Sequence, residues 1–115
     1  MVKENGYNGW SNYETWNVKL WMDNDQGSRE YWKEQTLEAF GRAADKDEAL
    51  YKLSEAIKDA HEEQAQDALE AAKVESSWIS DILNGSIREV DWYEIAESLY
   101  DDNKEDIEED KEKEQ

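Results

Sequence analysis

The chain of 115 residues contains no cysteine, no proline and no long run of apolar residues. Without cysteine, neither a disulfide framework nor a cysteine-based metal site can form. The first ten residues lack the apolar segment of a secretory signal, and no stretch approaches the roughly 18 apolar residues of a membrane span. We therefore expect a protein that stays in the cytoplasm of the cell that makes it.

Basic residues are also scarce, because 13 Lys and Arg face 31 Asp and Glu, which gives a formal net charge of −18. A polyanion repels phosphate, so direct binding to nucleic acid or to an anionic membrane is disfavoured. The complementary partner is a basic protein surface. Self-repulsion destabilises the compact state, and we expect the six Trp and six Tyr to offset it by burial.

Helix-start signals recur along the chain, and no useful run of β-type alternation is present. A Ser or Asp followed three residues later by Glu forms a capping box, which we expect at Ser11, Asp45 and Asp91. Ser28 can cap a further helix. Asn84-Gly85 should end another, because glycine suits the left-handed position after a helix. The sequence predicts helices over 12–24, 29–44, 46–72 and 76–84, and a fifth from residue 92.

The predicted fold is therefore all-α, a compact bundle of about five helices with a long third helix. At 1.5 Å per residue, that helix is about 40 Å long. Residues 101–115 hold nine acids, three lysines and a single apolar residue, Ile107. Such a stretch cannot bury enough surface to order itself. We expect one helical domain over 1–100 and a disordered acidic tail over 101–115.

One face of the predicted third helix is acidic, opposite an apolar stripe that runs from Leu50 through Ile57 to Ala71. Neighbouring acids lie one helical turn apart, which is comparable to the charge spacing of DNA phosphates. A solvated helix surface explains the same pattern. Like charges four residues apart cost helix stability, however. This cost favours the interpretation that the negative charge serves partner binding. The predicted partner-binding residues on this face are Glu48, Glu55, Asp59, Glu62, Glu63 and Glu70.

The aromatic residues fall into two predicted groups. Those on the main apolar stripes are assigned, with one leucine, to the core: Trp16, Leu20, Trp32 and Trp92. Those off the stripes are candidate partner contacts, because Trp and Tyr dominate the energetic hot spots of interfaces. This second group consists of Tyr7, Trp10, Trp21, Tyr31 and Tyr93.

Two blocks of the sequence carry a family resemblance. The segment NYETWNV at residues 12–18 and the segment EVDWYEIAESL at residues 89–99 resemble the two ends of a family of small uncharacterised proteins from phages, plasmids and bacteria. The resemblance implies a compact helical fold and an origin on a mobile element. It implies no activity and supplies no catalytic residue.

No catalytic residue, cofactor or metal site is predicted. His61 is the only histidine, and it lies near the edge of the apolar stripe, where structural packing explains it. No serine or cysteine stands in the context of an activated nucleophile. Residues 23–34 match a calcium loop at positions one, three and twelve, but position six is Ser28 where that loop requires glycine.

The sequence favours a non-enzymatic, acidic protein-binding inhibitor that mimics DNA. Its expected target is the basic nucleic-acid groove of a host defence or transcription enzyme, such as a restriction enzyme, a CRISPR complex or an RNA polymerase. The alternative is a helical adaptor that binds a protein through exposed aromatic residues, with the charge serving solubility only. A homodimer built on the spare apolar face of the first helix is a third interpretation.

Overall fold

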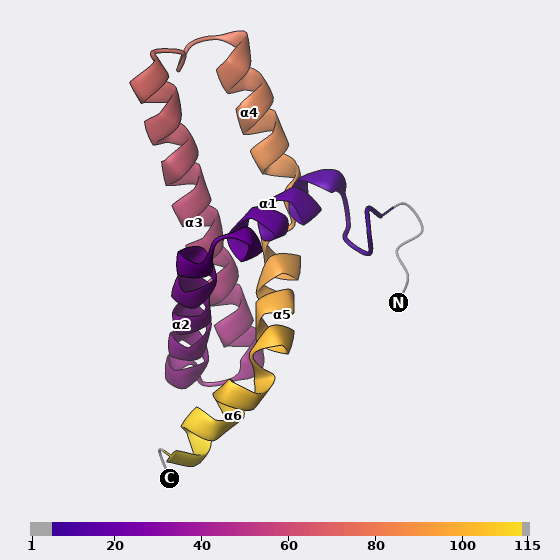
Figure 1. Cartoon of the computed structure of the whole chain (residues 1–115), viewed down its shortest axis with the longest axis vertical. Coiled ribbons are helices and arrows are strands. Elements are labelled where there is room, and N and C mark those ends of the chain that lie inside the picture. The colour runs from indigo at the N-terminus through magenta and orange to yellow at the C-terminus, as the bar shows by residue number, and fades with distance from the viewer. Residues whose placement is uncertain (1–5, 114–115) are drawn as a thin grey trace.

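The computed structural model describes residues 6–113, which form six helices and the isolated β-bridge Tyr7–Trp10 (Figure 1). The predicted all-α class and the long third helix are confirmed, with six helices in place of about five. The helices are α1 (Tyr13–Asn24), α2 (Gln26–Arg42), α3 (Lys46–Ala72), α4 (Trp78–Glu89), α5 (Trp92–Asp102) and α6 (Lys104–Lys113).

Side-chain caps explain where these helices begin. Asp45 and Asp91 accept the amide hydrogens of Glu48 and Glu94, at the two predicted helix starts. Ser11 and Ser28 are not the caps. The Asn12 carboxamide caps α1, and the Asp25 carboxylate caps α2 three residues earlier than expected. Asn and Asp side chains are at least as good as serine at this position, so Asn12 replaces the adjacent Ser11 and Asp25 replaces Ser28.

Asn84-Gly85 does not end α4, which continues to Glu89. Gly85 lies inside the helix, where glycine is tolerated at a cost of about 1 kcal/mol, so the predicted helix end at this glycine is wrong. A left-handed residue does end α3, where Lys73 has a φ of 60°. Its amide donates to the carbonyls of Leu69 and Glu70, and this cap turns the chain towards α4.

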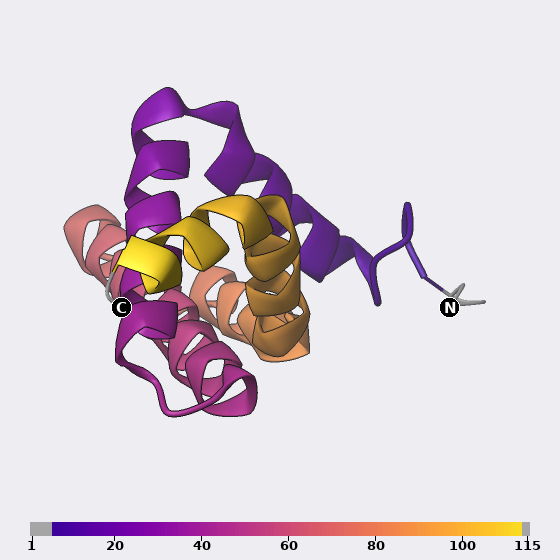
Figure 2. The ribbon, with the colours of Figure 1, turned by 90° about the horizontal axis from the view of Figure 1, so that it is seen from below.

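The core lies between α1, α2, the N-terminal half of α3, α5 and α6. Leu53, Ile57 and Ile95 are fully buried at its centre. Phe40 stacks on Tyr100 with ring centroids 4.9 Å apart. The end-on view in Figure 2 shows the helices of this body grouped around a common centre.

The C-terminal half of α3 and the antiparallel α4 extend beyond the body as a two-helix arm, defined here as residues 62–89 (Figure 1). The apolar stripe of α3 was expected to remain in the core as far as Ala71. In the structure it leaves the core near Ala60, and both Ala68 and Ala71 are exposed. The stripe therefore continues along the arm without a covering element from the described part of the chain.

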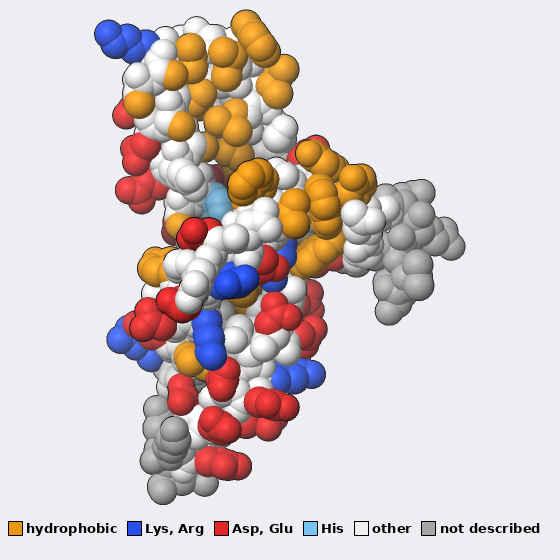
Figure 3. Space-filling model, in the orientation of Figure 1, with side chains coloured by type: hydrophobic (Ala, Val, Ile, Leu, Met, Phe, Trp, Pro, Cys, Tyr) orange, Lys and Arg blue, Asp and Glu red, His pale blue; other side chains and the backbone are white. Residues whose placement is uncertain are grey.

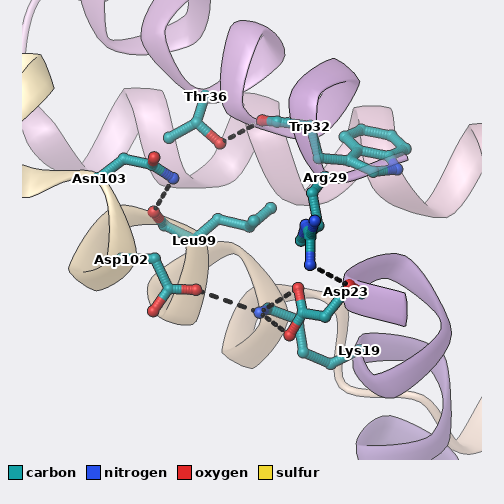
Figure 4. A network of polar contacts seen from close by, with 8 residues as sticks. All are labelled: Lys19, Asp23, Arg29, Trp32, Thr36, Leu99, Asp102 and Asn103. Atoms are coloured by element: carbon teal, nitrogen blue, oxygen red, sulfur yellow. Dashed lines mark hydrogen bonds and ion pairs between the residues drawn. The ribbon is translucent and has the colours of Figure 1, made fainter. Parts of the chain in front are cut away.

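Two polar networks fix the rotation of α1. The buried Lys19 ammonium lies 2.7 Å from the Asp23 carboxylate and 3.2 Å from that of Asp102 on α5 (Figure 4). At the other end, the Thr15 hydroxyl accepts the Asp91 amide at 2.8 Å, and the Asn12 side chain donates to the Glu89 carbonyl at 2.6 Å. The NYETWNV and EVDW segments therefore contact each other in space.

The structure places residues 104–113 of the expected disordered tail in α6, and residues 114–115 lie outside the described residues. Its one apolar residue explains the docking, because Ile107 is only 4% exposed and belongs to the core cluster. An ion pair of 3.0 Å between Lys33 and Asp106 joins α6 to α2.

Candidate functional site

The acidic face of α3 is divided along the helix. The two predicted residues nearest its N-terminus, Glu48 and Glu55, are half-buried and engaged by their own chain. Glu48 accepts the Ala44 amide and lies 3.8 Å from the Lys52 ammonium, while Glu55 accepts the Tyr51 hydroxyl. These two carboxylates are the less available part of the predicted site.

The other four predicted acids, Asp59, Glu62, Glu63 and Glu70, are exposed. Among residues 6–113, none of them is joined to a Lys or Arg by an ion pair. Asp67 lies between them, is exposed in the same way, and was missing from the prediction because it stands at the edge of the helical face. These five carboxylates, from Asp59 to Glu70, are called the acidic face below.

Four of the five candidate aromatic contacts are exposed. The exposed fractions are 66% for Trp21, 51% for Tyr31, 41% for Tyr7 and 38% for Tyr93. Desolvation, together with the nearby Asp47 and Glu97 carboxylates, raises the pKa of the Tyr93 hydroxyl. The fifth candidate, Trp10, is half-buried and packs against the core.

The predicted core assignment holds fully for only one of its four residues. Trp32 is 6% exposed, whereas Trp16 and Trp92 are half-buried and Leu20 is 37% exposed. Trp16 contacts the rings of Tyr7 and Tyr13 instead of the core cluster. The reason is that the buried face of α1 is formed by Thr15, Lys19 and Met22, which turns the apolar side of the helix outward.

Three further exposed apolar side chains lie on α4, a helix for which we predicted no site. Trp78 is 72% exposed, Ile82 63% and Ile79 39%. Figure 3 shows hydrophobic side chains gathered over α3 and α4 on one face of the arm, whereas charged groups crowd the lower body. The sequence signal for this surface is the helical spacing of its apolar residues, Trp78, Ile79, Ile82 and Leu83.

A hollow of about 460 Å³ lies where α1, α2 and α3 meet, lined in part by Val18, Trp21 and His61. The His61 ring lies between Trp32 and Trp92, with centroid distances of 6.1 and 5.5 Å. Its Nδ1 lies 2.8 Å from the Ile57 carbonyl. These contacts agree with structural packing.

The calcium-loop resemblance does not correspond to a loop. Helix α2 begins at Gln26 and runs through Glu34, the residue at position twelve. The Asp23 carboxylate binds the Lys19 ammonium, and the Asp25 carboxylate caps α2. Both acids therefore have structural partners of their own.

A family profile matches residues 3–114, which is nearly the whole chain. The chain belongs to DUF7249, a family of unknown function. No curated protein and no solved structure matches it. Within residues 6–113, no helix is both long enough and apolar enough to cross a membrane. Membership of DUF7249 assigns no chemistry. The acidic face of α3 and the exposed apolar side chains of the arm are therefore the basis for a functional proposal.

Proposed function

We propose that this DUF7249 protein is a non-enzymatic inhibitor that presents a row of carboxylates to the basic, nucleic-acid-binding groove of a target enzyme. The observation that supports this function is the acidic face of α3, with five exposed carboxylates on one helix and no ion pair to the described residues. An α-helix of 27 residues holds them in a fixed register.

The charge spacing of this face resembles that of one DNA strand. Asp59 and Glu70 are eleven residues apart, which is about 16 Å of helix axis. Five carboxylates over that length give about one charge per 4 Å, compared with 3.4 Å per phosphate along one strand. A groove that binds a phosphate backbone can therefore meet a similar density of negative charge on α3.

The same row of carboxylates lowers the stability of the helix unless a basic partner neutralises it. Acids three and four residues apart repel each other by a few tenths of a kcal/mol per pair. Lys58 is on the same helix but is half-buried and forms no ion pair with the described residues. A basic partner would relieve this repulsion, and opposite fields would accelerate association in a strongly salt-dependent manner.

The proposed targets are host defence or transcription enzymes, namely restriction enzymes, CRISPR complexes and RNA polymerase. Such enzymes have basic grooves for DNA or RNA and are the targets that an inhibitor of phage or mobile-element origin would meet. The proposed site of action is the cytoplasm of the host cell.

The experiment is affinity capture from host lysate with elution across a salt series, followed by competition with DNA. Captured enzymes should be released by salt, and the chain should displace fluorescent duplex DNA from them. Reversal of three charges in Asp59→Lys/Glu63→Lys/Glu70→Lys should weaken this competition at least tenfold, mainly by slowing association.

The matched control is Glu105→Lys/Glu108→Lys/Glu112→Lys on α6, which changes the net charge equally at exposed positions. Full competition by the α3 variant, or equal loss in both variants, would contradict a site on α3. In the second case only the bulk charge matters.

A second candidate function is an adaptor that binds proteins through exposed aromatic residues. The specific observation in its favour is that Trp21 and Trp78, two of the largest side chains, are 66% and 72% exposed. Under this function the captured partner would resist elution by salt, and substitution of the two tryptophans would release it.

A further inference from the structure

The apolar face of the arm is the largest feature that the proposed mimicry does not use. It consists of exposed side chains from both helices, namely Ala68, Ala71 and Ala72 on α3 and Trp78, Ile79 and Ile82 on α4. Together they expose on the order of 400 Å² of apolar surface, a size typical of interaction sites. Figure 3 shows this face with few charged groups across it.

The apolar face of the arm has the geometry that a docked helix requires. Two antiparallel helices form its floor, and alanines on α3 leave room for the backbone of a third helix to approach. Trp78 and Ile82 project from α4, one helical turn apart, and can insert between the side chains of that helix. Helix α4 has 12 residues and is about 18 Å long, which matches about three turns of a docked helix.

The charge around the face selects the partner. Residues 62–89 contain seven acids and only two basic residues, Lys73 and Arg88, so the arm alone carries a formal charge of −5. Figure 3 shows acidic side chains along the margin of the apolar face on α3. A helix that places apolar side chains on the face would therefore bring its flanking residues close to carboxylates.

We propose that the apolar face of the arm docks a basic amphipathic helix of the partner protein. Apolar residues spaced three and four apart cover Trp78, Ile79 and Ile82, and flanking lysines or arginines meet the surrounding acids. A second copy of this chain is a poorer occupant, because it would bring another −18 charge to the same surface. The inference rests on the proposed function only in that the partner is basic.

The probe is a fluorescent 18-residue peptide of Leu and Lys, with leucines at i, i+3, i+4 and i+7, measured by anisotropy against the full chain. The control peptide has the same composition in an order that destroys the helical stripe. The arm variant is Trp78→Ser/Ile82→Ser. Its matched control, Tyr13→Ser/Tyr51→Ser, removes two side chains that are 52% and 59% exposed on the body and that were not predicted as partner contacts.

The amphipathic peptide should bind the parent chain at least tenfold more tightly than the scrambled peptide. The arm variant should lose at least tenfold in affinity at unchanged melting temperature, and the body variant less than twofold. Indole NMR resonances should shift for Trp78 and not for the buried Trp32. Together these results would support docking on the arm.

Three results would overturn the inference. Equal binding of the two peptides would mean that only charge is recognised, and equal affinity of the two variants would move the site off the arm. A parent dimer in sedimentation velocity that the arm variant abolishes, with no binding of the peptide, would assign the face to a second copy.

The failure of either proposal can be recognised separately. The triple reversal on α3 tests competition with DNA, whereas the arm variant tests docking of the peptide. If the chain binds the amphipathic peptide through Trp78 but never displaces DNA, the docking inference holds and the proposed DNA mimicry fails. The opposite pair of results would retain the mimicry alone.

Discussion

The contact between the NYETWNV and EVDW segments gives a sharp expectation for Thr15→Val. Thr15 is fully buried, and its hydroxyl donates to the Asn12 carboxamide at 2.6 Å while accepting the Asp91 amide at 2.8 Å. Valine has nearly the same shape, so the substitution removes both hydrogen bonds and leaves the packing in place. The Asp91 N–H loses the hydrogen bond that it makes across the structure.

The expected cost follows from these two bonds. A net hydrogen bond contributes about 1 kcal/mol, and a donor left unsatisfied away from water costs about 1–3 kcal/mol. We expect the free energy of unfolding to fall by about 2–4 kcal/mol. For a domain of this size, that lowers the melting temperature by roughly 10–20 °C. Urea denaturation followed by circular dichroism measures it directly.

Thr36→Val is the matched control. Thr36 is equally buried, but its hydroxyl donates at 2.7 Å to the Trp32 carbonyl within its own helix, which also serves the backbone ladder. Its loss should cost less than about 1 kcal/mol, since no partner is left without a hydrogen bond. Equal destabilisation of the two variants would refute the reasoning, because it would show that the contact between Thr15 and Asp91 adds nothing.

Three further expectations concern the body of the fold. Trp32→Ala should cost about 3–5 kcal/mol in urea denaturation, whereas the half-buried Trp16 should cost only about 1–2 kcal/mol as alanine; equal costs would return Trp16 to the core. Lys19→Met should destabilise by about 1–2 kcal/mol, because it leaves two half-exposed carboxylates facing each other, and added salt should reduce the loss. Ile107→Ala should cost about 2 kcal/mol and remove hydrogen-exchange protection from residues 104–113; an unchanged exchange pattern would mean that α6 does not dock.

Local signals predicted the helices better than their faces. Asp45 and Asp91 marked two helix starts because a side-chain cap depends only on residues three positions apart. The rotation of α1 could not be read in this way. Its apolar side, with Trp16 and Leu20, was expected in the core, but the structure buries Thr15 and Lys19 instead. That choice depends on a backbone N–H donor, at Asp91, and a carboxylate, at Asp102, which lie more than 70 residues away in the sequence.

The candidate site shows the same division between local and distant information. Spacing alone placed Asp59, Glu62, Glu63 and Glu70 on one exposed side of a long helix, and the structure agrees. Spacing could not show that the Glu48 carboxylate would accept a hydrogen bond from the Ala44 amide in the preceding turn. Nor could it show that the apolar stripe outlasts the core, because the point where α3 leaves the body is set by the lengths of its neighbours.

We expect substitutions on the arm to change partner binding with little effect on stability. Helix α3 contributes to the core as far as Ala60, and beyond that point it carries most of the acidic face and the apolar face on different sides of one helix. Trp78 and Ile82 are too exposed for their removal to cost much folding free energy, and neither belongs to the core cluster. A substitution there that abolishes binding therefore acts on the interface, since the body that holds the arm remains unchanged.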